Sequence, residues 1–427
     1  MIVRTCAVLL FILVNLLLNS EIGAQPGNKS ICETCACFPT NVAPTSVNCT
    51  CIKNKFLIIR PTDASLLLAV KELTLAACGL VSLPPSGLPN ANLLKKVTVR
   101  DIKLFHYTAG LFPVLETLVI ENVDGLVLDG FGQANNTLKE LELRRTKVQK
   151  FVQGTVPASA PLRKITLDSV EIEEIEPGAL DMSFSHDKVE GFSMINSSVK
   201  TIEAGGVMVR SGSVKIVNST FDKLHSGSII VEEGREINLS GNKFNNVSLV
   251  GDSVTISRSR NFGDGNVTID GNEFFSLPAD LQIFKTDRHV TFANNIVHDV
   301  DLGPFLFGVG PTVRVSGNRF ECDCDSRRTS VLKLNQVFPG LLSDDSYFTV
   351  LLAENNCKQP ASMTLAGYRD ELIAGKTCPG TSLPTAEPTT PPMPTDSPSK
   401  SSSRSSSEIT MAVVTLFMII FTVLPLS

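Results

Sequence analysis

The sequence lacks the features that would indicate nucleic-acid binding or a familiar catalytic machinery. Lys and Arg total 38 against 43 Asp and Glu, a formal charge of −5 at pH 7, so no positive field is available to attract nucleic acid. No Walker loop, dinucleotide fingerprint or Gly-x-Ser-x-Gly nucleophile elbow is present. We therefore expect a protein that is not an enzyme and that needs no cofactor.

Metal-binding patterns are missing as well. None of the histidines belongs to a His-x-x-x-His or Glu-x-x-His pair. They are His106, His186, His225, His289 and His298. We expect no metal site and interpret these histidines as surface or loop residues.

The first 24 residues fit a secretory signal peptide. Arg4 supplies the charged start, Leu9 to Leu18 the apolar core and residues 22–24 a small-residue cleavage site. The mature chain would then begin near Gln25. Secretion exposes the chain to an oxidising compartment, where cysteines form disulfides.

Cysteine is absent from residue 79 to residue 321, and the mature chain carries its cysteines in one cluster on either side of that interval. Zinc ligation would need a second Cys or His pair at finger spacing, which is missing, so disulfides are favoured. The cysteines concerned are Cys32, Cys35, Cys37, Cys49, Cys51, Cys78, Cys322, Cys324, Cys357 and Cys378.

Asn-x-Ser/Thr sequons are frequent, and all of them precede residue 270. In a secreted chain this distribution favours N-glycosylation of several of them. They start at Asn28, Asn48, Asn135, Asn196, Asn218, Asn238, Asn246 and Asn266.

A repeat of about 23 residues fills the interval between the cysteine clusters. Six early units follow the pattern apolar-x-x-apolar-x-apolar, and five later units keep the last two apolar positions. The early units are Val70/Leu73/Leu75, Leu94/Val97/Val99, Leu115/Leu118/Ile120, Leu138/Leu141/Leu143, Leu162/Ile165/Leu167 and Val189/Phe192/Met194; the later ones are Val214/Ile216, Ile237/Leu239, Val267/Ile269, Val290/Phe292 and Val313/Val315. Each unit predicts a short strand that pairs in parallel with the next.

Polar residues follow the later strands at a fixed distance, as Ser219, Asn242, Asn272, Asn295 and Asn318. An asparagine that turns inward here offers donors and an acceptor to the backbone at the corner after the strand. Stacked units would repeat this contact as a ladder.

These features resemble an animal extracellular leucine-rich-repeat protein with cysteine-rich caps. The segment from Gly317 to Cys324, followed by Cys357 and Cys378, is similar to the C-terminal cap of that family, and Cys32-x-x-Cys35-x-Cys37 to its N-terminal cap. The resemblance implies an α/β solenoid, a horseshoe with a parallel sheet on its concave face and mostly irregular return segments.

Two departures mark the chain as a diverged member. It contains no Trp, and Ile102, Val123, Thr146 and Val170 stand where the ladder asparagine belongs. The resemblance implies a cap over residues 25–69, a repeat array over 70–316 and a second cap over 317–378.

The resemblance also implies a disulfide pattern. It pairs Cys322 with Cys357, Cys324 with Cys378, Cys32 with Cys37 and Cys35 with Cys49. Cys51 and Cys78 remain as a pair, although Cys78 at the ladder position could equally be a buried free thiol.

A parallel β-helix is the alternative for the second half, because it also stacks short parallel strands with asparagine ladders at this period. In that fold Asp264, Asp270 and Asp287 could serve to cleave a polysaccharide.

Function is predicted from the outward positions of the strands. In the first five units these carry mixed charge and no sequon, so we expect them to bind a protein ligand or counter-receptor. The residues are Lys71, Lys95, Lys96, Arg100, Glu116, Glu140, Glu142, Arg144, Arg163 and Lys164. A structural surface or matrix glycoprotein is the alternative without a specific ligand.

The C-terminal segment predicts attachment to the outer face of the plasma membrane. Residues 379–410 form a Pro/Thr/Ser-rich stalk, and residues 411–427 are apolar with nothing basic after them. Such a tail is short for a single-pass helix and fits a glycosylphosphatidylinositol signal, with Ser401 as the attachment site.

Overall fold

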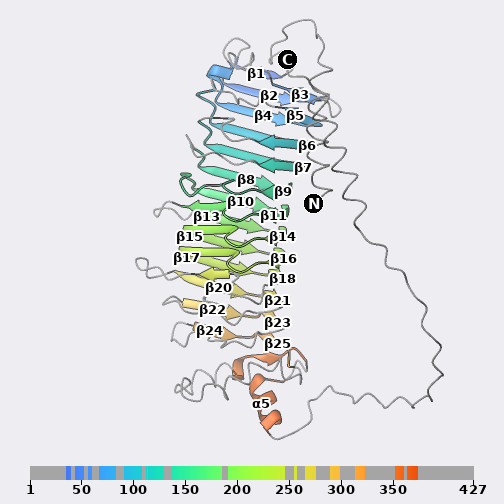
Figure 1. Cartoon of the computed structure of the whole chain (residues 1–427), viewed down its shortest axis with the longest axis vertical. Coiled ribbons are helices and arrows are strands. Elements are labelled where there is room, and N and C mark those ends of the chain that lie inside the picture. Colours follow the sequence, from blue (N-terminus) through green and yellow to red (C-terminus); the bar gives the residue numbers. More distant parts are fainter. Residues whose placement is uncertain are drawn as a thin grey trace, which may run out of the picture. The chain divides into compact units, whose positions relative to one another are not determined.

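The computed structural model describes a single stack of parallel strands (Figure 1). The described residues are 35–39, 44–51, 56–59, 67–82, 91–107, 112, 114–128, 137–184, 191–245, 254–256, 265–275, 289–298, 313–322, 352–359 and 363–373. They all belong to one compact unit, Met1–Pro379. The second unit, Gly380–Ser427, lies outside the described residues.

The architecture is a parallel β-helix rather than a horseshoe, so the leucine-rich-repeat interpretation is wrong. After each predicted strand the chain turns a corner and forms another strand. β8 (Glu140–Arg144) is followed by β9 (Lys147–Phe151), and in the next coil β10 (Lys164–Asp168) is followed by β11 (Glu171–Ile175). β8 pairs with β10 and β9 with β11, all in parallel. The return segments therefore contain strands, and the sheet that we expected on a concave face is one side of a coil.

Three parallel ladders, which we call faces 1, 2 and 3, run along the stack. Face 1 contains β2 (Ser46–Thr50), β4 (Glu72–Ala76), β8, β10, β13 (Gly191–Ile195), β20 (Asn266–Asp270), β22 (His289–Ala293) and β24 (Val313–Ser316). Face 2 contains β3 (Phe56–Ile58), β5 (Leu80–Ser82), β9, β11, β14 (Ser198–Ile202), β16 (Thr220–Leu224), β18 (Lys243–Phe244), β21 (Glu273–Phe274), β23 (Ile296–Val297), β25 (Arg319–Phe320) and β26 (Asn356–Cys357). Face 3 contains β12 (Leu180–Ser183) and β19 (Val254–Ile256).

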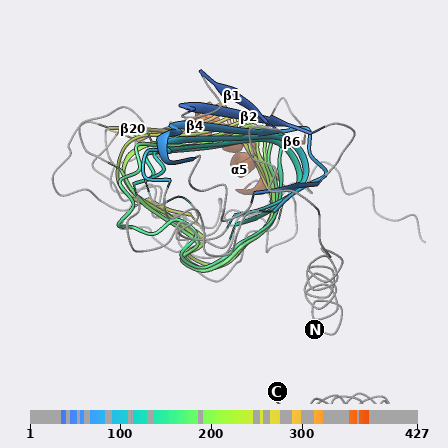
Figure 2. The ribbon, with the colours of Figure 1, turned by 90° about the horizontal axis from the view of Figure 1, so that it is seen from above.

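Four long strands turn a corner and contribute to two faces each. β6 (Lys96–Tyr107) and β7 (Thr117–Leu128) belong to faces 1 and 2, whereas β15 (Val207–Val217) and β17 (Ile229–Ser240) belong to faces 3 and 1. Seen along the stack, successive coils superimpose around a common interior (Figure 2).

The corner between faces 1 and 2 has the same geometry in the coils from β4 to β24. One residue adopts a positive φ, and the residue after it is buried in the interior. The positive-φ residues are Ala77, Asp101, Asn122, Arg145, Ser169, Asn196, Asn218, Gly241, Gly271, Asn294 and Gly317. The buried residues after them run from Cys78, Ile102 and Val123 to Asn295 and Asn318, so the position that we identified from the sequence does point inward in each coil.

The predicted asparagine ladder forms in the second half of the stack. The backbone N–H of Ser219 donates to Asn242 Oδ1, that of Asn242 to Asn272 Oδ1, that of Asn272 to Asn295 Oδ1 and that of Asn295 to Asn318 Oδ1, each at 2.9 Å. The buried side-chain nitrogens also donate to carbonyls of the preceding coil, for example Asn272 Nδ2 to Leu239 O at 2.8 Å. Each amide thus satisfies backbone groups that the corner would otherwise leave unpaired.

Apolar side chains fill the interior because strand residues alternate between inside and outside. The inward position of face 2 carries Phe221, Phe244 and Phe274 in successive coils. Their rings stack with centroids 5.1 and 4.9 Å apart. A stack of identical coils therefore gives a continuous core.

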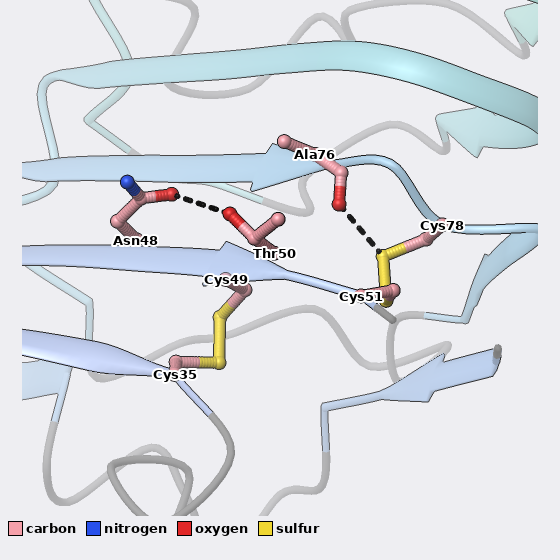
Figure 3. Close-up of a disulfide and its surroundings, with 7 residues drawn as sticks. All are labelled: Cys35, Asn48, Cys49, Thr50, Cys51, Ala76 and Cys78. Atoms are coloured by element: carbon pink, nitrogen blue, oxygen red, sulfur yellow. Dashed lines mark hydrogen bonds between the residues drawn. A yellow bond between two sulfur atoms is a disulfide. The ribbon is translucent and has the colours of Figure 1, made fainter. Parts of the chain in front are cut away.

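Disulfides hold the two ends of the stack. At the N-terminal end β1 (Ala36–Phe38) pairs antiparallel with β2, and disulfides join Cys35 to Cys49 and Cys51 to Cys78 (Figure 3). At the other end Cys322 is joined to Cys357, and the helix α5 (Leu365–Ile373) follows β26.

Cys35–Cys49 and Cys322–Cys357 are pairs that the resemblance implied. For Cys78, where a disulfide and a free thiol were both open, the structure shows the disulfide with Cys51. Cys37 is also disulfide-bonded, whereas Cys32, Cys324 and Cys378 lie outside the described residues.

Several expectations concern segments that the structure does not describe. The signal peptide, the stalk and the apolar tail with Ser401 lie outside the described residues, so they stay predictions. Within the described part of the chain no helix is long and apolar enough to cross a membrane.

Candidate functional site

One line of outward side chains on face 2 brings together polar and aromatic groups from distant parts of the sequence. The backbone amides of Asn245, Phe275, His298, Glu321 and Lys358 each donate to a face-2 residue of the preceding coil, over 2.7–3.0 Å. The five residues are therefore neighbours along the stack, and we call them the face-2 column. Strands in a sheet are about 4.8 Å apart, which sets the spacing of this column.

Three partly exposed side chains converge around the imidazole of His298. Its Nε2 lies 2.9 Å from Glu273 Oε1 and its Nδ1 lies 3.1 Å from Lys358 Nζ. Lys358 Nζ is also 3.2 Å from Glu321 Oε2, and that oxygen is 3.7 Å from His298 Nδ1. We call Glu273, His298, Glu321 and Lys358 the His298 cluster.

The proton positions in the cluster follow from its charges. An ammonium group can only donate, so His298 Nδ1 accepts from Lys358, and Nε2 carries the proton that it donates to Glu273. The hydrogen bond from His298 holds the pKa of Glu273 below its usual range, and Lys243, 3.6 Å away, acts in the same direction. Glu273 is therefore ionised at neutral pH.

An exposed aromatic ring lies beside the cluster. Phe275 is 62% exposed, and its ring centroid is 6.0 Å from that of His298. Large apolar side chains at the surface lose the benefit of burial, and a ring next to convergent polar groups is a common feature of ligand sites. On the preceding coil Asn245 Nδ2 donates to Asp222 Oδ1 at 2.9 Å, which extends the polar surface.

The cluster offers hydrogen-bonding groups rather than a metal site. Across the described ranges, no group of three or more His, Cys, Asp and Glu side chains could hold a metal ion. In addition, Lys358 Nζ donates to His298 Nδ1, so this nitrogen has no free lone pair for a metal ion.

The residues that we predicted for ligand binding gather on the outer side of face 1, from β4 to β10. Glu116 binds Lys95 Nζ at 2.8 Å and Lys139 Nζ at 2.6 Å. The hydrogen bond with Lys139 has the largest effect and that with Lys95 the next, and together they lower the pKa of Glu116 to about 2. Glu142 pairs with Arg144 at 2.5 Å on the same face. Nothing in this arrangement tests whether the surface binds a ligand.

Of the carboxylates named for the β-helix alternative, Asp270 alone lies among the described residues. Asp270 lies at a corner of the stack, where its Oδ1 accepts from Asn294 Nδ2 at 2.8 Å. Asp264 and Asp287 lie outside the described residues.

We expected the histidines to be surface or loop residues and did not anticipate the contacts of the partly exposed His298. The signal was present in the repeat, since Phe275, His298 and Glu321 follow one another at steps of 23 residues. If each coil has a second strand, residues at the same position of that strand in successive coils are neighbours, and these three residues would then lie side by side.

The sequons that the structure describes lie on face 1 or at the corner after it. Asn48, Asn238 and Asn266 belong to face-1 strands, and Asn196 and Asn218 occupy positive-φ corner positions. The Oδ1 atom of Asn238 is buried and has no hydrogen-bond partner. Asn28, Asn135 and Asn246 lie outside the described residues.

Comparison with known proteins agrees with the fold. A family model for a right handed beta helix region matches residues 183–326. The matched interval contains Glu273, Phe275, His298 and Glu321, and it does not point to a leucine-rich-repeat protein. No curated protein matches the chain.

Proposed function

We propose that the face-2 column binds an extended polysaccharide and does not cleave it. The observation that carries this proposal is the exposed ring of Phe275 beside the His298 cluster, on coils that match the right-handed β-helix family. This replaces our expectation of a protein ligand bound by a leucine-rich-repeat arc.

The chemistry of the column suits a sugar polymer. An aromatic ring offers an apolar face to the C–H groups of a pyranose, while carboxylate, imidazole, ammonium and amide groups can bind its hydroxyls. These groups recur along a straight line at the spacing of the coils, so a polymer lying parallel to the stack would meet a polar group at each step. The disulfides are typical of an oxidising, extracellular compartment, where such polymers occur.

The protonation states favour binding over hydrolysis. Glycoside cleavage needs one carboxylic acid that keeps its proton near neutral pH. The pKa values of Glu116, Glu176 and Glu273 are all lowered, in each case by a side-chain hydrogen bond with a lysine or histidine. The lowered pKa of Glu273, the carboxylate bonded to His298, supports a role as hydrogen-bond acceptor rather than as proton donor.

A glycan array followed by titration with the bound polysaccharide tests the proposal. Phe275→Ala and His298→Ala should each weaken binding by about tenfold, which corresponds to about 1.4 kcal/mol. Lys147→Gln is the matched control, because Lys147 is an exposed face-2 residue whose ion pair with Glu171 lies in an earlier coil.

Two results would contradict the proposal. One is equal affinity of Phe275→Ala, His298→Ala and the wild-type protein for every glycan that binds. The other is release of new reducing ends from the bound polysaccharide, which would show that the site is catalytic.

A further inference from the structure

A second line of side chains, at the edge of face 1 in the first five coils, is rich in cations. Its members are Lys71, Lys95, Glu116, Lys139 and Arg163, which we call the basic column. The amide of Lys95 donates to Lys71 O, that of Glu116 to Lys95 O, that of Lys139 to Glu116 O and that of Arg163 to Lys139 O, over 2.7–2.9 Å. The five residues thus follow one another in successive coils.

The charges in this column do not alternate. Lys71 and Lys95 are neighbours of like charge, and so are Lys139 and Arg163. In the adjacent column of the same coils Glu72 precedes Lys96 and Glu140 precedes Lys164. At the other edge of the face Arg100, Glu121, Arg144 and Asp168 alternate strictly. Like charges directly opposite each other in a sheet are destabilising, so the basic column is an exception within its own surface.

The single carboxylate of the column is already neutralised. Glu116 holds the ammonium groups of Lys95 and Lys139 within 2.8 Å. Lys71 and Arg163, at the two ends, are exposed and form no salt bridge among the residues that the structure describes. Among the described residues, each end of the line therefore presents a cation without a carboxylate partner.

We propose that the basic column binds a linear anionic polysaccharide that lies along the stack. Four steps of about 4.8 Å give the column a length of about 19 Å. Cations that repeat in a line match sulfate or carboxylate groups that repeat along a polymer. Because the adjacent column and the column at the other edge of face 1 are balanced in charge, the surface does not offer the broad positive field that nucleic acid requires.

This surface lies outside the residues matched by the β-helix family and is separate from the face-2 column. The two proposals can therefore fail independently. Phe275→Ala should leave binding at the basic column unchanged.

The experiment measures binding of the secreted protein to four probes over a range of NaCl concentrations. Heparin carries mainly sulfate, polygalacturonate carries carboxylate, dextran is neutral, and a DNA duplex is a polyanion of another class. We expect heparin, polygalacturonate or both to bind with an affinity that falls with salt, and dextran not to bind at this surface. Whichever acidic polymer binds identifies the anionic group that is recognised.

The double variant Lys71→Gln/Arg163→Gln should weaken binding of the acidic polymer by about tenfold and lower the magnitude of the salt slope by about two. Lys147→Gln/Lys200→Gln is the matched control, because it removes two exposed lysines that have carboxylate partners on face 2. The control should bind within twofold of the wild type. Unfolding midpoints of both variants establish that they are folded.

Three results would overturn the proposal. The first is equal affinity of Lys71→Gln/Arg163→Gln and the wild type for the acidic polymers. The second is the same loss in the control variant, which would indicate an effect of net charge alone. The third is tighter binding of DNA than of either acidic polysaccharide.

Discussion

Removal of one rung of the asparagine ladder should destabilise the stack well beyond an ordinary surface change. Asn295 is fully buried. Its Oδ1 accepts from the backbone N and the Nδ2 of Asn272 at 2.9 and 3.0 Å, and its Nδ2 donates to Ile269 O at 3.0 Å and Asn318 Oδ1 at 2.9 Å. Asn295→Ala removes these four hydrogen bonds at once.

The size of the effect follows from which groups lose their partners. The backbone N–H of Asn272 is left without an acceptor inside the stack, at a cost of about 1–3 kcal/mol. Ile269 O and Asn272 Nδ2 each lose one bond, at about 1 kcal/mol each. Asn272 Nδ2 keeps its bond to Leu239 O, and Asn318 Oδ1 keeps the backbone N–H of residue 295. The sum is a loss of about 3–5 kcal/mol in the free energy of unfolding.

Urea unfolding and hydrogen exchange measure this loss globally and locally. The urea midpoint of Asn295→Ala should fall, and the amide of Asn272 should lose protection because its acceptor is gone. Asn294→Gly is the control, since Asn294 is an exposed neighbour at φ 56°, a conformation that glycine adopts freely. Asn294→Gly removes one hydrogen bond to Asp270 and should lower the free energy of unfolding by about 1 kcal/mol or less. Equal stability of Asn295→Ala and Asn294→Gly, with the Asn272 amide still protected, would refute the reasoning.

Two further predictions concern packing and pH. An added Cβ at Gly191 would overlap the carbonyl oxygen of Ser213 in the next coil, so Gly191→Ala should cost about 3 kcal/mol or more. At Gly271, with φ +65°, an added Cβ would have no neighbouring atom closer than 4.0 Å, so Gly271→Ala should lower the free energy of unfolding in urea by only about 1 kcal/mol. A smaller loss for Gly191→Ala than for Gly271→Ala would contradict the expected overlap. The pKa of Glu116 is lowered from 4.5 to about 2, so its pairing stabilises the fold above pH 4.5 and is lost as the pH falls towards 2. The unfolding midpoint of Glu116→Gln should therefore change less than that of the wild type between pH 6 and pH 2, and an equal change in both would exclude this role.

Much of the stack could be predicted from the sequence because the repeat constrains it. The strands of face 1 and the inward position after each corner both follow from apolar-x-apolar spacing and from the asparagine that recurs at a fixed distance. The same spacing occurs in leucine-rich repeats, and it does not specify the return segment. The strands of face 2 carry only two buried apolar residues each, three positions apart, as in Val148 and Phe151 or Ile172 and Ile175. This spacing does not show the period of a strand.

The candidate site could not be predicted because it depends on the register between coils. Glu273 and His298 are separated by 25 residues, and Glu321 and Lys358 by 37, yet each pair is in contact. Glu321 and Lys358 are joined only because β25 pairs directly with β26. A long intervening segment of this kind leaves no periodic trace in the sequence.

The register between coils also determines which charged side chains become neighbours on the surface of the stack. Equal positions in successive coils lie about 4.8 Å apart, so any charged column must alternate, be neutralised by a ligand or accept the cost of repulsion. On face 2 the alternation is local, as in Lys147 with Glu171 and Glu173 with Lys200. In the face-2 column Glu321 likewise precedes Lys358, whose Nζ lies 3.2 Å from Glu321 Oε2. The basic column departs from the rule where Lys71 precedes Lys95 and where Lys139 precedes Arg163, and this departure is the reason for proposing an anionic ligand at this surface.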